Sequence, residues 1–304
     1  SISAFLQPGN YFEAGISVLD PNVSGKVRNG YTPNAALPAS SARLQNTSVG
    51  EMAGDYYFPS AALKLQVTDN FSFGLIYDQP FGAEAEYSTG TQKTTALPGP
   101  LAPLGNQGAF HNGTEGTSGE VKSQSISMLF GYQPTENFNF YAGPVYQTIK
   151  GDVQLRGLAY GGNATFGGYN ASIKETGDIG WLAGAAFQIP DIALKASVTY
   201  RSEIEHSVNV KESFNSAGLL AGLNAAPSLN TDITTPQSVN LDFQTGIMAN
   251  TVAFANVRWV DWSNFSIQPY KFGIASKNAI VQGQTGKPEF DLVAYTDDQI
   301  SATV

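Results

Sequence analysis

The side chains best suited to catalysis in this sequence are few. The chain has 2 histidines, and His206 stands between Glu205 and Ser207. Serine, histidine and an acid are the residue types of nucleophilic hydrolysis. Neighbouring residues of a strand point to opposite faces of its sheet, so on the strand expected here these three side chains cannot converge on one substrate. The other histidine, His111, lies in a long loop. We therefore expect that the protein is not an enzyme.

Other site chemistry is also missing from the sequence. The chain has 0 cysteines, which excludes disulfides, thiolate metal sites and a cysteine nucleophile. It contains no metal-ligand spacing, no glycine-rich phosphate loop and no nucleophile elbow. We expect neither a cofactor nor a bound metal. The net charge of -9 repels phosphate backbones, which disfavours nucleic acid as a partner.

The composition favours strands over buried helices. Hydrophobic residues make up 42% of the chain and charged residues only 13%, about half the charged share of an ordinary soluble domain. A membrane-spanning helix needs about 20 consecutive apolar residues, and polar residues or glycines interrupt every apolar stretch here. No signal peptide begins at Ser1. Either a leader has been removed or the sequence starts inside a longer chain.

Alternation of apolar and polar residues recurs along most of the chain, as expected where side chains point to the two faces of a strand in turn. In residues 192–204 one face carries Ile192, Leu194, Ala196, Val198, Tyr200 and Ile204, and the other carries Lys195, Ser197, Thr199, Arg201 and Glu203. The same pattern occurs in residues 11–20, 61–67, 71–77, 125–130, 179–187, 239–243 and 252–259.

Short and long connections alternate between these segments. The short ones are turns at residues 68–70, 134–137, 190–191 and 249–250, and the long ones are polar loops at residues 26–54, 88–119, 157–177 and 213–236. Membrane barrels combine short turns at one end, long loops at the other, and aromatic residues at both interfaces. A soluble β-sandwich also has alternating strands, but its outer face carries more charge. We predict an all-β fold, an antiparallel transmembrane β-barrel.

The sequence also resembles a known family. Segments 19–25, 77–87, 199–204 and 259–265, in this order, are similar to segments of the FadL-type long-chain fatty-acid transporters. The resemblance implies a fourteen-stranded barrel in the bacterial outer membrane, closed by an N-terminal hatch, that takes up hydrophobic compounds. The family's hatch and last strands lie outside this sequence. We therefore expect residues 1–304 to form a single barrel domain that is incomplete at both ends.

The segment Pro80, Phe81 and Gly82 is expected to interrupt a strand. Proline cannot donate to the strand ladder and glycine often marks a bulge. In the family, the corresponding position is similar to a kink that opens a side hole in the barrel wall, so the resemblance implies a lateral gate here. An ordinary bulge at the rim of a barrel is the alternative.

The resemblance also implies a cation for the head group of the substrate. A carboxylate in an apolar pocket needs a partner with directed donors. Arg156 resembles the family's lumen arginine, with an alignment shift of one residue. Lys271 and Lys287 follow the fourth segment, where the family has a second cation, and the sequence does not choose between them. For each cation a structural role is the alternative.

Two loops are unusually apolar for connections expected to face outward. Residues 96–104 contain Leu97, Leu101 and Leu104, and residues 217–226 contain Leu219 and Leu220. Exposed apolar surface often marks a binding site, so these leucines are predicted to form an entrance groove. The alternative is that they pack on one another as a lid.

The predicted function is passive transport of long-chain fatty acids or related hydrophobic compounds across the outer membrane. Capture by the loops, a pocket in the lumen and lateral exit at the kink are the expected steps. The expected partners are the transported compound, outer-membrane lipids and lipopolysaccharide. A general diffusion porin for small polar solutes is the alternative, and a structural or adhesive barrel is a third possibility. The sequence does not determine which hydrophobic compound is carried.

Overall fold

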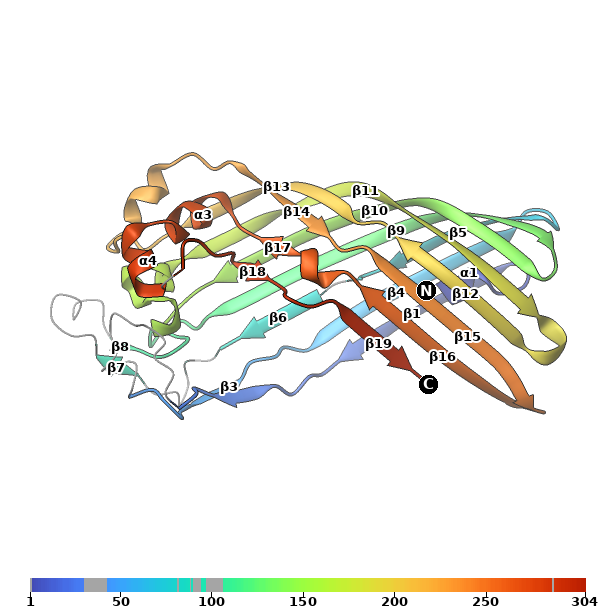
Figure 1. Cartoon of the computed structure of the whole chain (residues 1–304), viewed down its shortest axis with the longest axis horizontal. Coiled ribbons are helices and arrows are strands. Elements are labelled where there is room, and N and C mark those ends of the chain that lie inside the picture. The colour runs from blue at the N-terminus through green and yellow to red at the C-terminus, as the bar shows by residue number, and fades with distance from the viewer. Residues whose placement is uncertain are drawn as a thin grey trace.

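A single antiparallel sheet that curls around its long axis dominates the structure (Figure 1). The computed structural model describes residues 2–29, 43–80, 82–87, 89, 94–96, 106–285 and 287–304. The main path of the sheet contains β1 (Tyr11–Leu19), β4 (Tyr56–Gln66), β5 (Phe71–Asp78), β9 (Ser118–Thr135), β10 (Phe138–Gln154), β11 (Asn170–Ile189), β12 (Leu194–Arg201), β15 (Ser238–Met248), β16 (Thr251–Val260) and β19 (Gln299–Thr303). Strands β6 (Gly82–Glu86), β13 (Ile204–Ser213) and β14 (Asn230–Thr235) extend this path at the end that carries the loops.

The remaining elements are short. They are the helices α1 (Ile2–Phe5), α3 (Tyr270–Ser276) and α4 (Ala279–Thr285), the paired strands β2 (Ser24–Lys26) with β3 (Ser48–Glu51), β7 (Thr95–Ala96) with β8 (Asn106–Gln107), and β17 (Ser266–Ile267) with β18 (Val293–Ala294), and the 3-10 turns η2 (Leu158–Tyr160), η3 (Gly162–Ala164), η4 (Phe166–Gly168), η5 (Pro190–Ile192), η6 (Ala221–Ala225) and η7 (Trp262–Asn264). No described helix is long and apolar enough to cross a membrane.

The predicted all-β architecture is confirmed as an antiparallel, strongly curled half-barrel, with strands longer than the alternation alone indicates. The predicted strand 192–204 is the main correction. Ile192 lies in η5, and the strand is interrupted after Arg201. Beyond the interruption Ile204 is buried, whereas Val198 is exposed. These two residues therefore do not share a face as the alternation predicts, because an irregularity at residues 202–203 shifts the phase of the strand.

Parts of the predicted loops are strands. Residues 170–177 belong to β11, and β14 lies within the segment 213–236. The helices α3 and α4 lie in a segment for which we predicted no helix.

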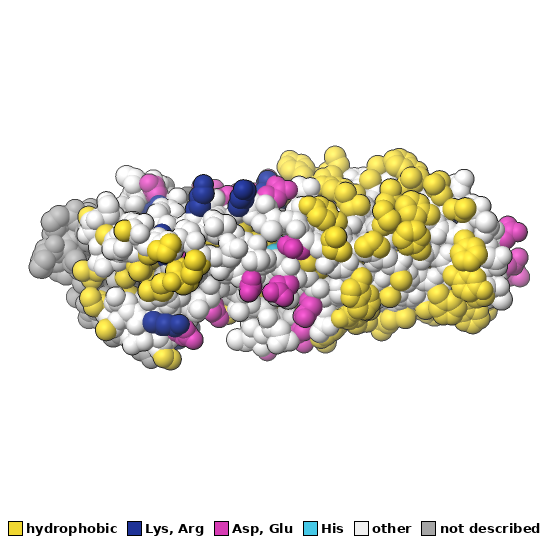
Figure 2. All heavy atoms as spheres, turned by 90° about the horizontal axis from the view of Figure 1, so that it is seen from above, with side chains coloured by type: hydrophobic (Ala, Val, Ile, Leu, Met, Phe, Trp, Pro, Cys, Tyr) yellow, Lys and Arg dark blue, Asp and Glu magenta, His cyan; other side chains and the backbone are white. Residues whose placement is uncertain are grey.

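Outward-facing hydrophobic side chains form a belt over one half of the molecule (Figure 2). We call this belt the apolar band; it comprises Phe12, Ile16, Val18, Leu63, Leu65, Ile126, Met128, Phe130, Phe140, Ile179, Trp181, Val198, Leu241, Phe243, Val252, Phe254 and Val257. Such a band is the surface that a membrane barrel presents to lipid. The strands β9, β10 and β11 continue beyond the band toward the loops.

The N-terminal segment packs inside the curl of the sheet. Phe5 of α1 is 1% exposed and contacts Tyr141 edge-on. The ammonium groups of Lys64 and Lys195 donate to the carbonyl oxygens of Gln7 and Leu6. Inward-facing cations thus bind the backbone of this segment directly.

A second hydrophobic cluster lies at the loop end, where α3 and α4 pack against β13. Phe166, Phe214 and Phe272 are buried there. The carboxylate of Glu212, 8% exposed, accepts hydrogen bonds from the hydroxyl of Tyr169 and from two backbone N–H groups at the start of α3. Burial, followed by the charge of Glu212, raises the pKa of Tyr169, so its hydroxyl remains a donor at neutral pH.

Candidate functional site

The barrel wall is interrupted between β5 and β6. Strand β5 pairs with β9 as far as Asp78 and Ser125, and β6 resumes the pairing at Gly82 and Lys122. The interval spans a step of four residues on the β5–β6 side and of three on β9, so it contains one extra residue, as in a β-bulge. Pro80 lies in this interval and has no amide N–H. Pairing therefore breaks where the sequence predicts it, and the role of the break as a gate stays a prediction.

Across the break lies a stretch of β4 that is paired with β1 on one edge but, among the described residues, with neither β5 nor β6 on the other. The β4–β5 ladder ends at Ala61 and Tyr77, and the next contact is the isolated bridge between Ala53 and Ala85. No described residue of β5 or β6 pairs with the stretch between them. Pro59, which also lacks an N–H, lies in this stretch. Phe81, the middle residue of the predicted gate, falls outside the described residues.

An apolar cavity of 640 Å³ lies behind this gap. Phe58 and Pro80 line it at the gap, and Ile149, Leu155, Ile173, Ile233, Trp262, Phe265, Leu292 and Tyr295 are among the residues that line the rest. A volume of this size is in the range of small-molecule sites, which are mostly apolar with a few polar groups. The cavity extends from the break in the wall to the residues around η7 and β18. This cavity and the break beside it form the candidate site.

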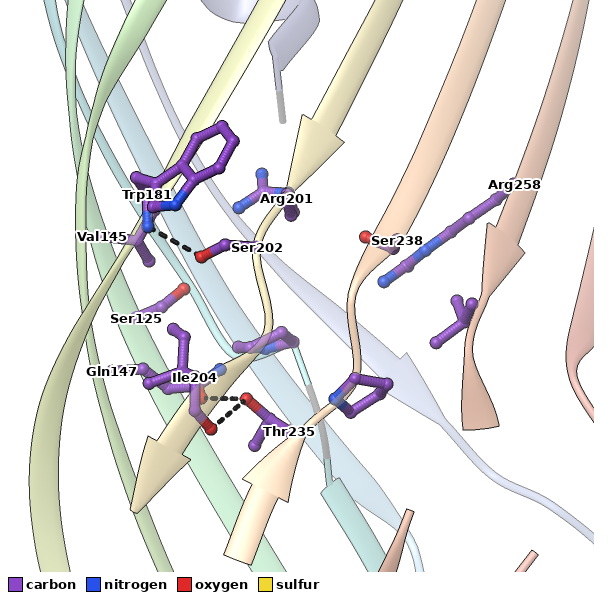
Figure 3. Close-up of a pocket in the computed structure, with 13 residues that line it drawn as sticks. Ser125, Val145, Gln147, Trp181, Arg201, Ser202, Ile204, Thr235, Ser238 and Arg258 are labelled. Carbon is purple, nitrogen blue, oxygen red and sulfur yellow. Dashed lines mark hydrogen bonds between the residues drawn. The ribbon is translucent and has the colours of Figure 1, made fainter. Parts of the chain in front are cut away.

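A second, smaller pocket of about 40 Å³ adjoins the cavity (Figure 3). Both are lined by Pro80, Thr235 and Pro236. Arg201 of β12 and Arg258 of β16 line the smaller pocket only. Since both arginines are partly buried, this pocket brings two positive charges next to the apolar cavity.

The predicted cation Arg156 is placed in a structural network. Its side chain is 9% exposed, and its Nε donates to Glu115 Oε2 at 2.9 Å. The terminal nitrogens donate to the carbonyl oxygens of Leu155 and Tyr169 and to Oδ1 of Asn170. Arg156 thereby holds the end of β10 to the start of β11. Its contact with a substrate stays a prediction.

The structure separates the other two predicted cations from the cavity. Lys271 is 3% exposed in α3, and its backbone N–H donates to Glu212. Lys287 is exposed, and its backbone N–H donates to Thr285. Neither lysine lines the apolar cavity, and a role for either at the head group stays a prediction.

The predicted entrance leucines are only partly described. Leu219 is 58% exposed, whereas Leu220 is 3% exposed and packs in the cluster around α3. The burial of Leu220 agrees with the alternative that the loop packs as a lid. The exposed side chain of Leu219 remains free to contact a transported compound. Leu97, Leu101 and Leu104 fall outside the described residues.

The structure also places the histidine that looked catalytic. His206 is fully buried, while Glu205 and Ser207 are exposed on the opposite face of β13, which agrees with the prediction from strand geometry. His206 Nδ1 lies 2.8 Å from Oδ2 of Asp178, and its Nε2 lies 3.0 Å from Oε1 of Gln147. Among the described residues no group of three or more His, Asp or Glu is suited to hold a metal ion.

The smaller pocket lined by Arg201 and Arg258, which we call the arginine pocket, was not predicted from the sequence. Alternation placed Arg201 on the polar face of its strand but gave no reason to single it out, and Arg258 lies in a predicted strand of the same kind. The available signal was an arginine near the end of each strand, on its polar face. The partners of these arginines depend on register between strands, which the sequence pattern does not determine.

No protein-family model matches the sequence, and no curated protein sequence matches it. Solved structures do match the fold. A FadL homologue from Pseudomonas aeruginosa superposes with a TM-score of 0.50 at 16% identity, covering 86% of this chain and 62% of that chain. For the toluene transporter TbuX of Ralstonia pickettii the TM-score is 0.51 at 13% identity, over 99% of this chain and 75% of that one. For the toluene transporter TodX of Pseudomonas putida it is 0.51 at 15% identity, over 88% and 65%.

These likenesses establish the fold. The chain matches the barrels of FadL-type transporters over most of its length, so the resemblance in the sequence is confirmed at the level of architecture. The chain spans 62% of the length of the FadL homologue and 65% of that of TodX.

Proposed function

We propose that this chain forms the wall of an outer-membrane channel through which hydrophobic small molecules pass without an energy source. The observation that supports this function best is the apolar cavity of 640 Å³, which reaches the interrupted stretch of the wall at Phe58 and Pro80. An apolar compound in the cavity would lie beside a stretch of β4 that lacks backbone partners among the described residues of β5 and β6. The apolar band places the molecule in lipid.

The transported compounds are long-chain fatty acids or related hydrophobic molecules. Two of the structural neighbours are toluene transporters, which adds monoaromatic hydrocarbons to the candidates. The exposed side chain of Leu219 belongs to the capture surface at the loop end. A porin for small polar solutes needs a water-filled lumen, and the lining of this cavity is mainly apolar.

Transport then follows partition. The compound leaves water at the loops, enters the apolar cavity, and exits through the gap between β4 and the β5–β6 break into the outer leaflet of lipid and lipopolysaccharide. The first step removes apolar surface from water, and each later step moves it from one apolar environment to the next, so the compound does not return to water on the way. The chain's part is to provide the surface and the opening.

The register supplies a direct test of the exit. Because the break contains one residue more than the facing strand, deletion of Pro80 brings β5 and β6 into one continuous register against β9. We expect the deletion variant of the full-length protein to bind a labelled long-chain fatty acid as the wild type does. We also expect its uptake into liposomes to fall to the protein-free rate.

The matched control is Pro80→Ala, which restores an N–H but keeps the extra residue. This variant should retain most of the uptake. Unchanged uptake in the deletion variant would refute lateral exit at the break. If the wild type binds neither a fatty acid nor toluene, the porin for polar solutes becomes the better function.

A further inference from the structure

Three lysines lie on the outward face of the barrel, between the apolar band and the loop end. They are Lys150 of β10, Lys174 of β11 and Lys211 of β13, and we call them the lysine row. All three are exposed, whereas the residues beside them on these strands, such as Ile173 and Val210, are buried. Figure 2 shows cationic side chains in this region and none over the visible part of the apolar band.

The strand register brings the lysines of the row together. Lys150 faces a bulge of β11 that contains Lys174 and Glu175. Lys211 is opposite Ser172, which lies two residues from Lys174 on the same face of β11. Diagonal neighbours on one face of a sheet are within reach of long side chains. A single anionic group can therefore contact more than one of these lysines.

The ammonium groups of the lysine row have no partner among the described residues, which form neither a hydrogen bond nor an ion pair with them. The neighbouring Lys122 differs, because its ammonium group lies 2.6 Å from a carboxylate oxygen of Glu120. Lys122 also stands directly opposite Lys150, and like charges opposite each other destabilise a sheet. An anion bound at the row would therefore stabilise this part of the wall.

A polar hollow of 370 Å³ adjoins the lysine row. We call it the outer hollow; its lining includes Asp152, Gln154, Asn170, Ser172, Lys211 and Ser213. The carboxylate of Asp152 and the hydroxyl of Ser172 make no hydrogen bond to any described residue. Hydroxyl, amide and carboxylate side chains offer the donors and acceptors that the hydroxyl groups of a sugar need. Because Lys211 belongs to both the row and the hollow, a sugar and a phosphate attached to it can bind side by side.

The level of the lysine row matches the head groups of the outer leaflet. Along β10, Tyr146 is the exposed large hydrophobic residue nearest the loop end, and Lys150 follows four residues later. Four residues of a strand span about 13 Å, which is about 10 Å of height at a strand tilt of about 40°. A lysine side chain can bend back toward the lipid surface from this level. The row then meets phosphate groups that lie just beyond the acyl chains.

We propose that the lysine row and the outer hollow bind the phosphorylated sugar head group of lipopolysaccharide in the outer leaflet. The lysines bind the phosphate groups as compact point charges, and the hollow binds the adjoining sugar. The inference rests on the outer-membrane location in the proposed function, with the loop end facing outward. It goes beyond that function because it assigns a second site, for a lipid that is not transported.

The test measures the binding of deep-rough lipopolysaccharide, which retains lipid A and the innermost core sugars, to the full-length protein in detergent. Lys150 also borders the apolar cavity, so the variant is Lys174→Gln/Lys211→Gln. Each exposed ion pair contributes a factor of about two to five to an equilibrium constant, and we expect this variant to bind about 10-fold more weakly than the wild type. Lipopolysaccharide without its phosphate groups should bind the two proteins equally weakly.

The matched control is Lys26→Gln/Arg28→Gln, which removes two exposed cations that do not line the outer hollow and should bind like the wild type. Ser172→Trp tests the outer hollow separately, because it fills the space beside Lys211 without changing the charge. This variant should also bind lipopolysaccharide more weakly.

Equal affinity of the wild type and the lysine variant would overturn the site. If phosphatidylglycerol bound as tightly as lipopolysaccharide, with the same loss in the lysine variant, the surface would be a general site for anionic lipids and the sugar contact would be overturned. Unchanged binding by Ser172→Trp would overturn the part of the outer hollow. Fatty-acid uptake into liposomes that lack lipopolysaccharide should be equal in the wild type and the lysine variant. If the wild type bound lipopolysaccharide but took up no fatty acid, the proposed function would fail and this site would stand.

Discussion

Side chains replace missing backbone pairs at a second place in the wall. The β11–β13 ladder ends at Ile173 and Val210, and the β11–β12 ladder starts at Leu182 and Arg201. Between these pairs, buried His206 bridges Asp178 and Gln147. The side chain of this histidine thus links β13 to β10 and β11 in the interval between the two ladders.

This contact predicts a dependence of stability on pH. Burial lowers the pKa of His206 below its usual 6.5, and the charge of Asp178 opposes this shift without cancelling it. Gln147 of β10, which contacts the ring, and Thr235 of β14, whose hydroxyl donates to Gln147, are both neutral. Below pH 6.5 the unfolded chain therefore binds a proton more readily than the folded one, and folding loses about 1.4 kcal/mol for each unit of depression.

We expect the thermal midpoint of the wild type to fall between pH 7.5 and pH 5.0. In His206→Gln, which keeps a hydrogen-bonding side chain but does not titrate, the decline should be smaller. Thermal unfolding of both proteins at the two pH values measures the difference. Equal declines in the two proteins would contradict the assignment of the effect to His206.

Among the elements, the parts of the fold that a sequence can predict are the local ones. Alternation identified most strands because it reflects the two faces of a single strand. Alternation did not predict the phase shift after Arg201, because a bulge depends on how the strand pairs with a neighbouring strand that is distant in the sequence. The helix α3 was not predicted for a similar reason. Its first backbone N–H groups donate to Glu212, which is distant in the sequence and is itself held by the hydroxyl of Tyr169. Of the candidate site, the sequence predicted the break at Pro80 but not the arginine pocket.

One close approach between strands leads to a stability prediction. At Gly143 of β10, an added Cβ would lie 1.6 Å from the carbonyl oxygen of Met128 on β9. Since that atom belongs to backbone, Gly143→Ala must separate two paired strands, and we expect a loss of about 2 kcal/mol or more of unfolding free energy. Urea unfolding of the protein refolded in detergent measures this loss.

The matched control is Gly15→Ala on β1, where an added Cβ meets no atom within 4 Å. This variant should unfold close to the wild type. If both alanine variants lost the same stability, strand glycines would matter through the unfolded chain, and the close approach of β9 and β10 would not explain the result.

At the scale of the whole molecule, the apolar band and the asymmetry of the connections define an orientation. The tight turns lie at one end of the barrel, and the loops with α3 and α4 lie at the other (Figure 1). In outer-membrane barrels the short turns face the periplasm and the long loops face outward. Figure 2 shows the band nearer to the end opposite these loops, so the loop end projects far from the lipid.

Residues 1–304 contain no cysteine, so single-cysteine variants in this part of the protein can measure the orientation. Leu219→Cys places a thiol at an exposed position of the loop end, and Asp69→Cys places one in an exposed tight turn. A maleimide that does not cross membranes should label Leu219→Cys on intact cells, and Asp69→Cys only after the outer membrane is permeabilised. Labelling of Asp69→Cys alone on intact cells would reverse the orientation. The cavity would then open toward the periplasm, and capture at Leu219 would have to be abandoned.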